Sequence, residues 1–140
     1  MMTRIDARDR LIVALDVPSA AEADALVARM GDQVRFVKVG LELYTVAGPD
    51  IVRKLVDRGK RVFLDLKFLD IEETVRRATA RVAAMGATFL TVHANRKALI
   101  AAVQGRGSSD LKLLAVTVLT NFDGEDLREM GIQRSVQDLV

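Results

Sequence analysis

The sequence contains no cysteine and a single histidine, and each shortage excludes a class of site. Without cysteine there is no disulfide, no thiolate nucleophile and no cysteine-bound zinc. One histidine, His93, is too few for a histidine-built metal centre and makes a Ser-His-Asp triad a poor hypothesis. A buried histidine that makes a hydrogen bond at a strand end is the commoner use of such a residue. We therefore expect no metal site and a structural role for His93.

Excess charge and long apolar runs are also lacking. Lys and Arg number 21 against 19 Asp and Glu, so the net charge is +2, which does not favour nucleic acid or a membrane surface as a partner. No apolar run approaches the length of a transmembrane helix. The N-terminal stretch MMTRIDARDR is polar and contains an acidic residue, unlike a signal peptide. We expect a cytoplasmic protein that binds neither nucleic acid nor membranes.

Short apolar runs recur along the chain, in which half of the residues are hydrophobic. Because these runs lack strict polar alternation, they predict strands buried on both faces, as in a parallel sheet covered by helices. The predicted strands cover residues 11–17, 34–39, 61–66, 88–93 and 111–119.

Segments with helical spacing alternate with the predicted strands. Ser19 and Glu22 predict a capping box at the start of the first helix. Pro49 suits the first turn of the second, and Gly86 predicts the end of the third. The stretch 105–109 predicts a flexible connection. The predicted helices cover residues 20–30, 49–59, 72–85, 97–104 and 124–130.

This β-α alternation fits either an open doubly wound sheet or a β/α barrel. No glycine-rich fingerprint follows the first predicted strand, which argues against a nucleotide-binding open sheet. Polar side chains instead recur at successive strand ends, as in barrel active sites. These residues are Asp16, Lys38, Asp65, Lys67, His93 and Thr120. We therefore predict that residues 1–140 form a single domain of the α/β class and make up about five units of a (β/α)₈ TIM barrel.

A charged cluster follows the third predicted strand, in the order Asp65-Leu66-Lys67-Phe68-Leu69-Asp70. The pattern alone is weak, because a strand that runs into a solvated loop also produces it. Asp65, however, lies within an apolar strand, where an unpaired carboxylate would be costly to bury. Lys67, two residues on, faces the same side of an extended strand, and Lys38 ends the preceding strand. We expect these charges to pair.

An array of alternating carboxylates and ammonium groups suits one kind of reaction. A carbanion that forms beside a lysine is stabilised by the ammonium and then takes its proton. A carboxylate placed where a substrate carboxylate must sit disfavours the bound ground state. Decarboxylation followed by protonation needs no metal and no organic cofactor in such a field.

Five segments carry a more specific pattern: 13–16 (VALD), 38–44 (KVGLELY), 62–74, 91–94 (TVHA) and 114–120. In this order they resemble the orotidine 5′-phosphate decarboxylase family over essentially the whole chain. The resemblance implies a (β/α)₈ barrel that converts orotidine 5′-phosphate to uridine 5′-phosphate in pyrimidine biosynthesis. It also implies a homodimer with shared active sites.

The resemblance assigns roles to particular residues. Lys67 would donate the proton to the pyrimidine carbanion, and Asp65 would lie against the departing carboxylate. Lys38 would join the charged network and contact the ribose, and Asp16 would bind a ribose hydroxyl. Thr120 matches a position that contacts the pyrimidine.

A second group would serve the neighbouring subunit. Asp70, counted with the catalytic residues, and Thr74 would reach into the partner's site, and Ile71 between them would also contact substrate. The sequence departs from the family pattern nearby. Leu69 stands where bacterial members have histidine, and Glu72-Glu73 replaces proline and a neutral amide, which adds negative charge near a site for an anionic substrate.

Two other functions stay open. Related sugar-phosphate decarboxylases and synthases use the same D-x-K-x-x-D strand but bind magnesium through an acidic residue at the position of Lys38. A non-catalytic half-barrel is the other alternative, because a complete barrel typically needs ~250 residues. The phosphate-binding loops of barrels commonly follow strands seven and eight, so we expect the 140 residues alone to be inactive.

Overall fold

The computed structural model describes residues 5–140, so the first four residues of the polar N-terminal stretch lie outside the described residues. One sheet of five parallel strands forms its centre, in the order β1-β2-β3-β4-β5. Strand order that follows chain order is typical of a β/α barrel, whereas doubly wound sheets reverse direction. The strands are β1 (Ile12–Ala14), β2 (Phe36–Gly40), β3 (Arg61–Phe68), β4 (Phe89–His93) and β5 (Lys112–Val116).

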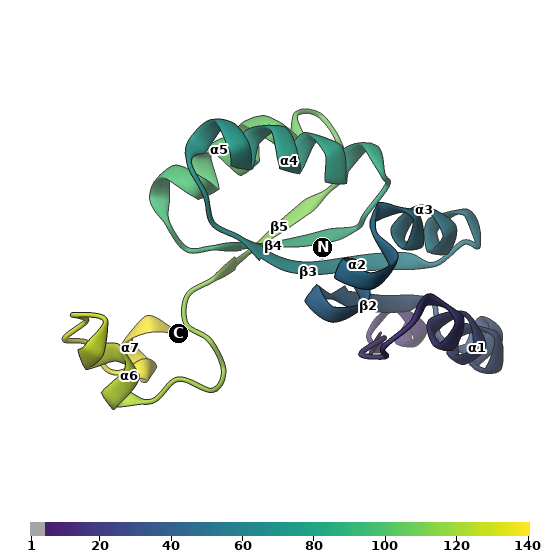
Figure 1. Ribbon diagram of the computed structural model, residues 1–140, viewed down its shortest axis with the longest axis horizontal. Helices are drawn as coiled ribbons and strands as arrows, with labels where there is room; N and C mark the ends of the chain where they lie inside the picture. Colours follow the sequence, from purple (N-terminus) through teal and green to yellow (C-terminus); the bar gives the residue numbers. More distant parts are fainter. Residues whose placement is uncertain (1–4) are drawn as a thin grey trace.

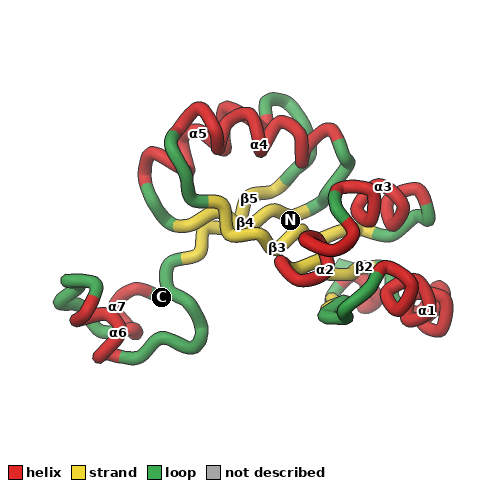
Figure 2. The backbone as a smooth tube through the Cα atoms, in the orientation of Figure 1, coloured by secondary structure: helices red, strands yellow, loops and turns green. Residues whose placement is uncertain are grey.

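Helices connect the strands, and Figure 2 shows the alternation of the two. The α-helices are α1 (Ala20–Met30), α2 (Leu41–Ala47), α3 (Pro49–Asp57), α4 (Glu72–Ala84), α5 (Arg96–Arg106), α6 (Gly124–Glu129) and α7 (Val136–Leu139). Two 3₁₀ turns, η1 (Ala7–Asp9) and η2 (Gly31–Gln33), precede β1 and β2. No helix within residues 5–140 is both long and apolar enough to cross a membrane.

The core lies between the sheet and the helices. Figure 1 shows α4 and α5 side by side along one face of the sheet. Alternate strand residues point into this layer and are fully buried, among them Val37, Val62, Leu64 and Leu90. The expected burial of the strands on both faces is only partly present, because β2 is buried along most of its length whereas β5 has no fully buried residue. The opposite face carries a cluster of Phe36, Phe63 and Phe89, with ring centroids 5.1 and 5.9 Å apart.

Most predicted helix ends are confirmed. The Ser19 hydroxyl accepts from the backbone N–H of Glu22 at 3.2 Å, and Pro49 occupies the first turn of α3. Gly86 follows the end of α4 with φ of +80°, the left-handed conformation that glycine adopts at a helix C-terminus. The predicted capping box is only half formed. The Glu22 carboxylate accepts from the Ser19 hydroxyl at 3.2 Å, whereas a capping box requires it to accept from the Ser19 backbone N–H.

Other expectations were wrong. The stretch 105–109 is not wholly a flexible connection, because α5 continues through Arg106. Gly105 lies so close to α4 that a Cβ there would meet the backbone oxygen of Arg76 at 2.2 Å. Helix α2 was not predicted, and β5 ends at Val116, before residue 119. Beyond β5, Figure 1 shows the chain leaving the sheet for α6 and α7, which lie apart from it.

Candidate active site at the ends of the strands

The end of β3 departs from regular strand geometry. Leu64 pairs with Leu90 and Phe68 with Val92, so β3 carries two more residues than β4 over this stretch. Lys67 lies inside the irregularity with φ of +49°, the only non-glycine residue with positive φ among residues 5–140. Left-handed backbone costs an L-residue about 1–2 kcal/mol and is frequent at functional sites. The bulge and the left-handed residue therefore indicate a functional site at the end of β3.

Charged side chains from three neighbouring segments meet there. The Lys67 Nζ lies 2.9 Å from Asp65 Oδ1, and the Lys38 Nζ lies 3.8 Å from Asp65 Oδ2. The same Lys38 Nζ lies 3.4 Å from Asp16 Oδ1, just after β1. Carboxylate and ammonium groups thus alternate along the ends of β1, β2 and β3. The pairing expected for Asp65 is present with both lysines.

Asp65 is the most enclosed of these charges, with 15% of its side chain exposed. Burial by itself would raise the pKa of this carboxyl. Hydrogen bonds from Lys67 and Thr91, and the positive charges of Lys67 and Lys38, outweigh burial and hold the pKa of Asp65 below its ordinary value. Asp65 is therefore a fixed negative charge at neutral pH.

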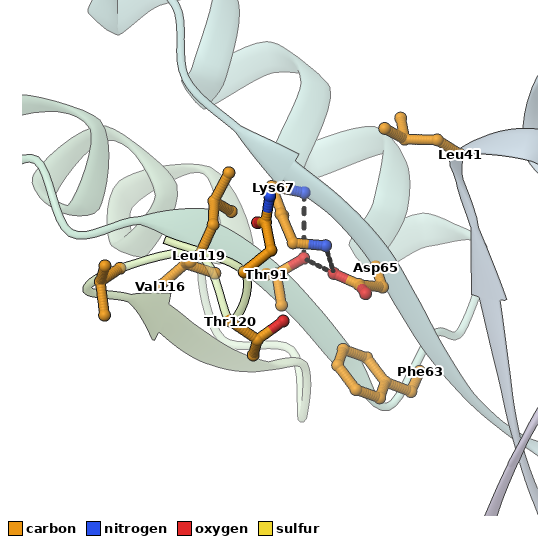
Figure 3. A pocket seen from close by; sticks show the side chains of 10 residues that line it. Leu41, Phe63, Asp65, Lys67, Thr91, Val116, Leu119 and Thr120 are labelled. Carbon is orange, nitrogen blue, oxygen red and sulfur yellow. Dashed lines mark hydrogen bonds and ion pairs between the residues drawn. The ribbon is translucent and has the colours of Figure 1, made fainter. Parts of the chain in front are cut away.

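Thr91 is a site residue that the sequence analysis missed. Its hydroxyl donates to Asp65 Oδ1 at 2.8 Å and accepts from the backbone N–H of Lys67 at 3.0 Å (Figure 3). Thr91 is 5% exposed and comes from β4. Strand alternation could have placed it on the same face as the charges, but nothing local in the sequence ties it to Lys67.

Asp65, Lys67 and Thr91 line one side of a pocket of about 540 Å³. Figure 3 shows Lys67, Thr91 and Asp65 joined by hydrogen bonds, with Phe63 below them and Thr120 across from them. The pocket is lined by Leu41, Phe63, Asp65, Lys67, Thr91, Val116, Val118, Leu119, Thr120 and Asn121. An apolar wall beside a charged one can hold a flat, polar ring and expose one of its edges to the charges.

Asp70 and Thr74 lie outside this pocket. Both are exposed, and both line a separate depression of about 180 Å³. The Asp70 carboxylate accepts from the backbone N–H of Ile71 at 2.7 Å and pairs with no cation within residues 5–140. Ile71 is 70% exposed, as is Leu69 at 57%. The predicted site residues therefore form two groups, one around Asp65 and one on the outside.

Two further predictions have mixed outcomes. Thr120 lines the pocket, as a residue at the end of the fifth predicted strand should, although it follows β5 by four positions. His93 ends β4 but is only half-buried, and its side chain has no hydrogen-bond partner within residues 5–140. The expectation that His93 is buried and makes a side-chain hydrogen bond was therefore wrong.

Glu73, the extra acidic residue, does not stand alone. Its carboxylate accepts hydrogen bonds from Arg76 at 2.7–2.8 Å and from Arg77 at 2.6 Å. These bonds lower the pKa of Glu73 to about 2. Two guanidinium groups offset one carboxylate, so the start of α4 has no excess of negative charge around Glu73.

No group of three His, Cys, Asp or Glu side chains within residues 5–140 has the spacing of a metal site. Asp65, which lines the pocket, and Asp16 are instead bridged by the Lys38 ammonium. An ammonium between two carboxylates repels a divalent cation from the same position.

The sequence matches the orotidine 5′-phosphate decarboxylase / HUMPS family over residues 9–140. It is 54% identical over 134 residues to an orotidine 5′-phosphate decarboxylase of Nitrobacter winogradskyi, a match that covers 96% of this chain and 56% of the relative. It is 49% identical over 140 residues to the enzyme of the same name from Rhodopseudomonas palustris, covering 100% of this chain and 60% of the relative. The chain thus spans a little over half the length of these relatives.

Solved structures agree with the fold. The crystal structure of orotidine 5′-phosphate decarboxylase from Lactobacillus acidophilus superposes with a TM-score of 0.85 at 38% identity, covering 93% of this chain and 62% of that one. The structure of an uncharacterised conserved protein from Geobacillus kaustophilus gives the same TM-score at 39% identity, covering 91% and 64%. The structural neighbours of this family are TIM barrels, in agreement with the strand order seen here.

Proposed function

Because this chain belongs to the orotidine 5′-phosphate decarboxylase / HUMPS family, we propose that it provides the reactive half of a decarboxylase acting on orotidine 5′-phosphate. The observation that carries the proposal is the alternating array of Asp16, Lys38, Asp65 and Lys67, of which Asp65 and Lys67 line the pocket. The product would be uridine 5′-phosphate, a step of pyrimidine biosynthesis.

The geometry supports a division of labour within the array. A substrate carboxylate placed beside Asp65 meets a fixed negative charge, which favours loss of CO₂ from the bound state. The electron pair left on the ring carbon then faces the Lys67 ammonium, which stabilises it and donates a proton to that carbon. Lys38, 3.8 Å from Asp65 and 3.4 Å from Asp16, bridges the two carboxylates, and its charge helps to hold the pKa of Asp65 below its ordinary value. Asp16, 61% exposed, is open to a ribose hydroxyl.

The pocket also accommodates the base. Phe63, Val116 and Leu119 provide an apolar surface for a pyrimidine, and Thr120 provides a hydroxyl opposite the charged wall. We infer that Thr120 contacts the pyrimidine. A phosphorylated nucleotide does not cross membranes unaided, which favours a cytoplasmic site of action.

The test is turnover in a complete barrel. Residues 1–140 would be joined to the remaining part of the Nitrobacter relative, and formation of uridine 5′-phosphate from orotidine 5′-phosphate would be followed with and without a chelator. We expect turnover that chelation leaves unchanged, and turnover by residues 1–140 alone that is lower by orders of magnitude. Loss of activity that magnesium restores, or turnover of a sugar phosphate only, would contradict the proposal.

We further propose a homodimer in which Asp70, Ile71 and Thr74 serve the partner's pocket. Their exposure, and their separation from the Asp65 group within the chain, support this arrangement. Lys67→Ala and Asp70→Ala would each be inactive as complete barrels. Mixed under subunit exchange, they should recover up to about a quarter of wild-type activity, because half of the dimers carry one intact site of two. Exchange without recovery would place Asp70 in its own chain's site.

A further inference from the structure

We propose that Thr91 is a positioning residue whose single hydroxyl holds both the backbone turn that presents Lys67 and the carboxylate that pairs with Lys67. The inference deepens the proposed function, since it takes Lys67 as the proton donor. It concerns a residue on a different strand, 24 positions along the chain from Lys67.

The bulge in β3 creates the need for such a residue. With two extra residues on β3 between the Leu64 and Phe68 pairs, the ladder to β4 is interrupted where Lys67 lies. A bulged backbone N–H that loses its ladder partner must find another acceptor, because an unpaired buried donor is costly. The Thr91 hydroxyl is that acceptor for Lys67, at 3.0 Å. The left-handed turn at Lys67, with φ of +49°, is thus tied to β4 by a side chain.

The same hydroxyl closes a ring of contacts. It donates to Asp65 Oδ1 at 2.8 Å, and the Lys67 Nζ donates to that same oxygen at 2.9 Å. The backbone and the side-chain end of Lys67 are therefore fixed against one carboxylate through Thr91 (Figure 3). A hydroxyl can donate one hydrogen bond, and the Thr91 hydroxyl donates it to Asp65, so it cannot also donate to a substrate. Its role is to position the pair, and it makes no direct contribution to the reaction.

Thr79 provides a matched control. Thr91 and Thr79 are the two buried polar residues of the described chain, 5% and 0% exposed. The Thr79 hydroxyl, between α4 and α5, has no hydrogen-bond partner within residues 5–140. Replacing threonine by valine keeps the shape and removes the hydroxyl, so the same change deletes two bonds at Thr91 and none at Thr79.

The experiment compares Thr91→Val, Thr91→Ser and Thr79→Val in the complete barrel. We expect Thr91→Val to lower kcat about 10- to 100-fold with KM changed less, because a misplaced reacting group costs that much, and Thr91→Ser to stay within about threefold. Thr79→Val should leave kcat unchanged. Equal kcat for Thr91→Val and Thr79→Val, or failure of serine to preserve the rate, would overturn the proposal.

A second readout does not depend on turnover. By NMR on the same proteins, the Lys67 amide should lose its protection from hydrogen exchange in Thr91→Val and keep it in Thr91→Ser. The pKa of Asp65 should rise in the valine variant alone, since one of its hydrogen bonds is gone. Unchanged exchange and titration would refute the role of Thr91 even if the enzyme acts on another substrate. If Thr91→Val does not fold, Thr91→Cys, with its weak donor, replaces it.

Discussion

The rim where β3 meets β4 and the interface between α4 and α5 use buried polar groups in opposite ways. At the rim, regular backbone geometry is given up, and the Thr91 hydroxyl makes a bond in each direction. At the helix interface the backbone is regular and very closely packed at Gly105, while the Thr79 hydroxyl is buried without a partner. The rim thus combines a strained backbone with a hydroxyl whose hydrogen bonds are all made. The helix interface combines a regular, closely packed backbone with a hydroxyl that makes no hydrogen bond.

The difference shows which region serves chemistry. A regular apolar strand would stabilise the fold at least as well as a left-handed lysine paired with a carboxylate. At the helix interface, by contrast, the close approach of Gly105 to the backbone of Arg76 serves the packing of α4 against α5. Substitutions at the rim should therefore change activity more than stability, and substitutions at the interface should change stability more than activity.

The largest effect is expected from Lys67→Ala in the complete barrel. It removes the ammonium that stabilises the carbanion and supplies the proton, so decarboxylation should fall by about 10³-fold or more. Lys97→Ala is the control, because Lys97 is 71% exposed and, among residues 5–140, forms an ion pair only with Glu72; its rate should match wild type. Retention of a tenth of the rate by Lys67→Ala would remove Lys67 from the mechanism.

Gly105→Ala should give the largest loss of stability. The new Cβ would meet the Arg76 oxygen at 2.2 Å, so α4 and α5 must separate, at a cost of about 2–3 kcal/mol in the free energy of unfolding. At Gly107, with φ of +55° and open space, alanine should cost only about 1 kcal/mol of backbone strain. Denaturant unfolding measures both. Equal losses would show that α5 shifts away from α4 without difficulty.

The Asp65 pair should make stability depend on acid pH. Its folded pKa lies below the ordinary 3.8, so its stabilisation is present above that pH and is lost as the pH falls through the folded value. In Asp65→Asn this part of the pH dependence should disappear. Unfolding measured from neutral to strongly acid pH tests this, and identical profiles for both proteins would contradict the pairing.

The smallest effect is expected from Glu73→Gln. Although two arginines lower the pKa of Glu73 to about 2, its side chain is 50% exposed, and exposed ion pairs contribute little. The unfolding midpoint at neutral pH should stay near that of wild type, and the difference between the two proteins should not change when salt is added. A large loss would mean that this network organises α4.

The sequence predicted the alternation of strands and helices because apolar runs and helix caps are local signals. Ser19, Pro49 and Gly86 acted as expected. Helix α2 was missed because it begins directly after Gly40, with no separating turn to mark it. Gly105 was assigned to a connecting loop although it lies within α5. The glycine is required by the close approach of the α4 backbone, which is distant in sequence and leaves no local signal.

The charged array was predictable in the same way, because strand ends of a parallel barrel share one edge. Asp16, Lys38, Asp65 and Lys67 were all expected there, and they do meet. The role of Thr91 was not predictable, because it depends on a bulge, and lysine is not a residue whose presence indicates positive φ.

The left-handed turn at Lys67 is held for chemistry at a cost to the fold. Lys67→Gly tests it directly against Lys67→Ala, because glycine adopts positive φ without strain. Measured unfolding free energy should be higher for the glycine variant by about 1 kcal/mol, with decarboxylation lost in both. Lower stability for Lys67→Gly would contradict the strain at Lys67, and turnover preserved in either variant would contradict its role as proton donor.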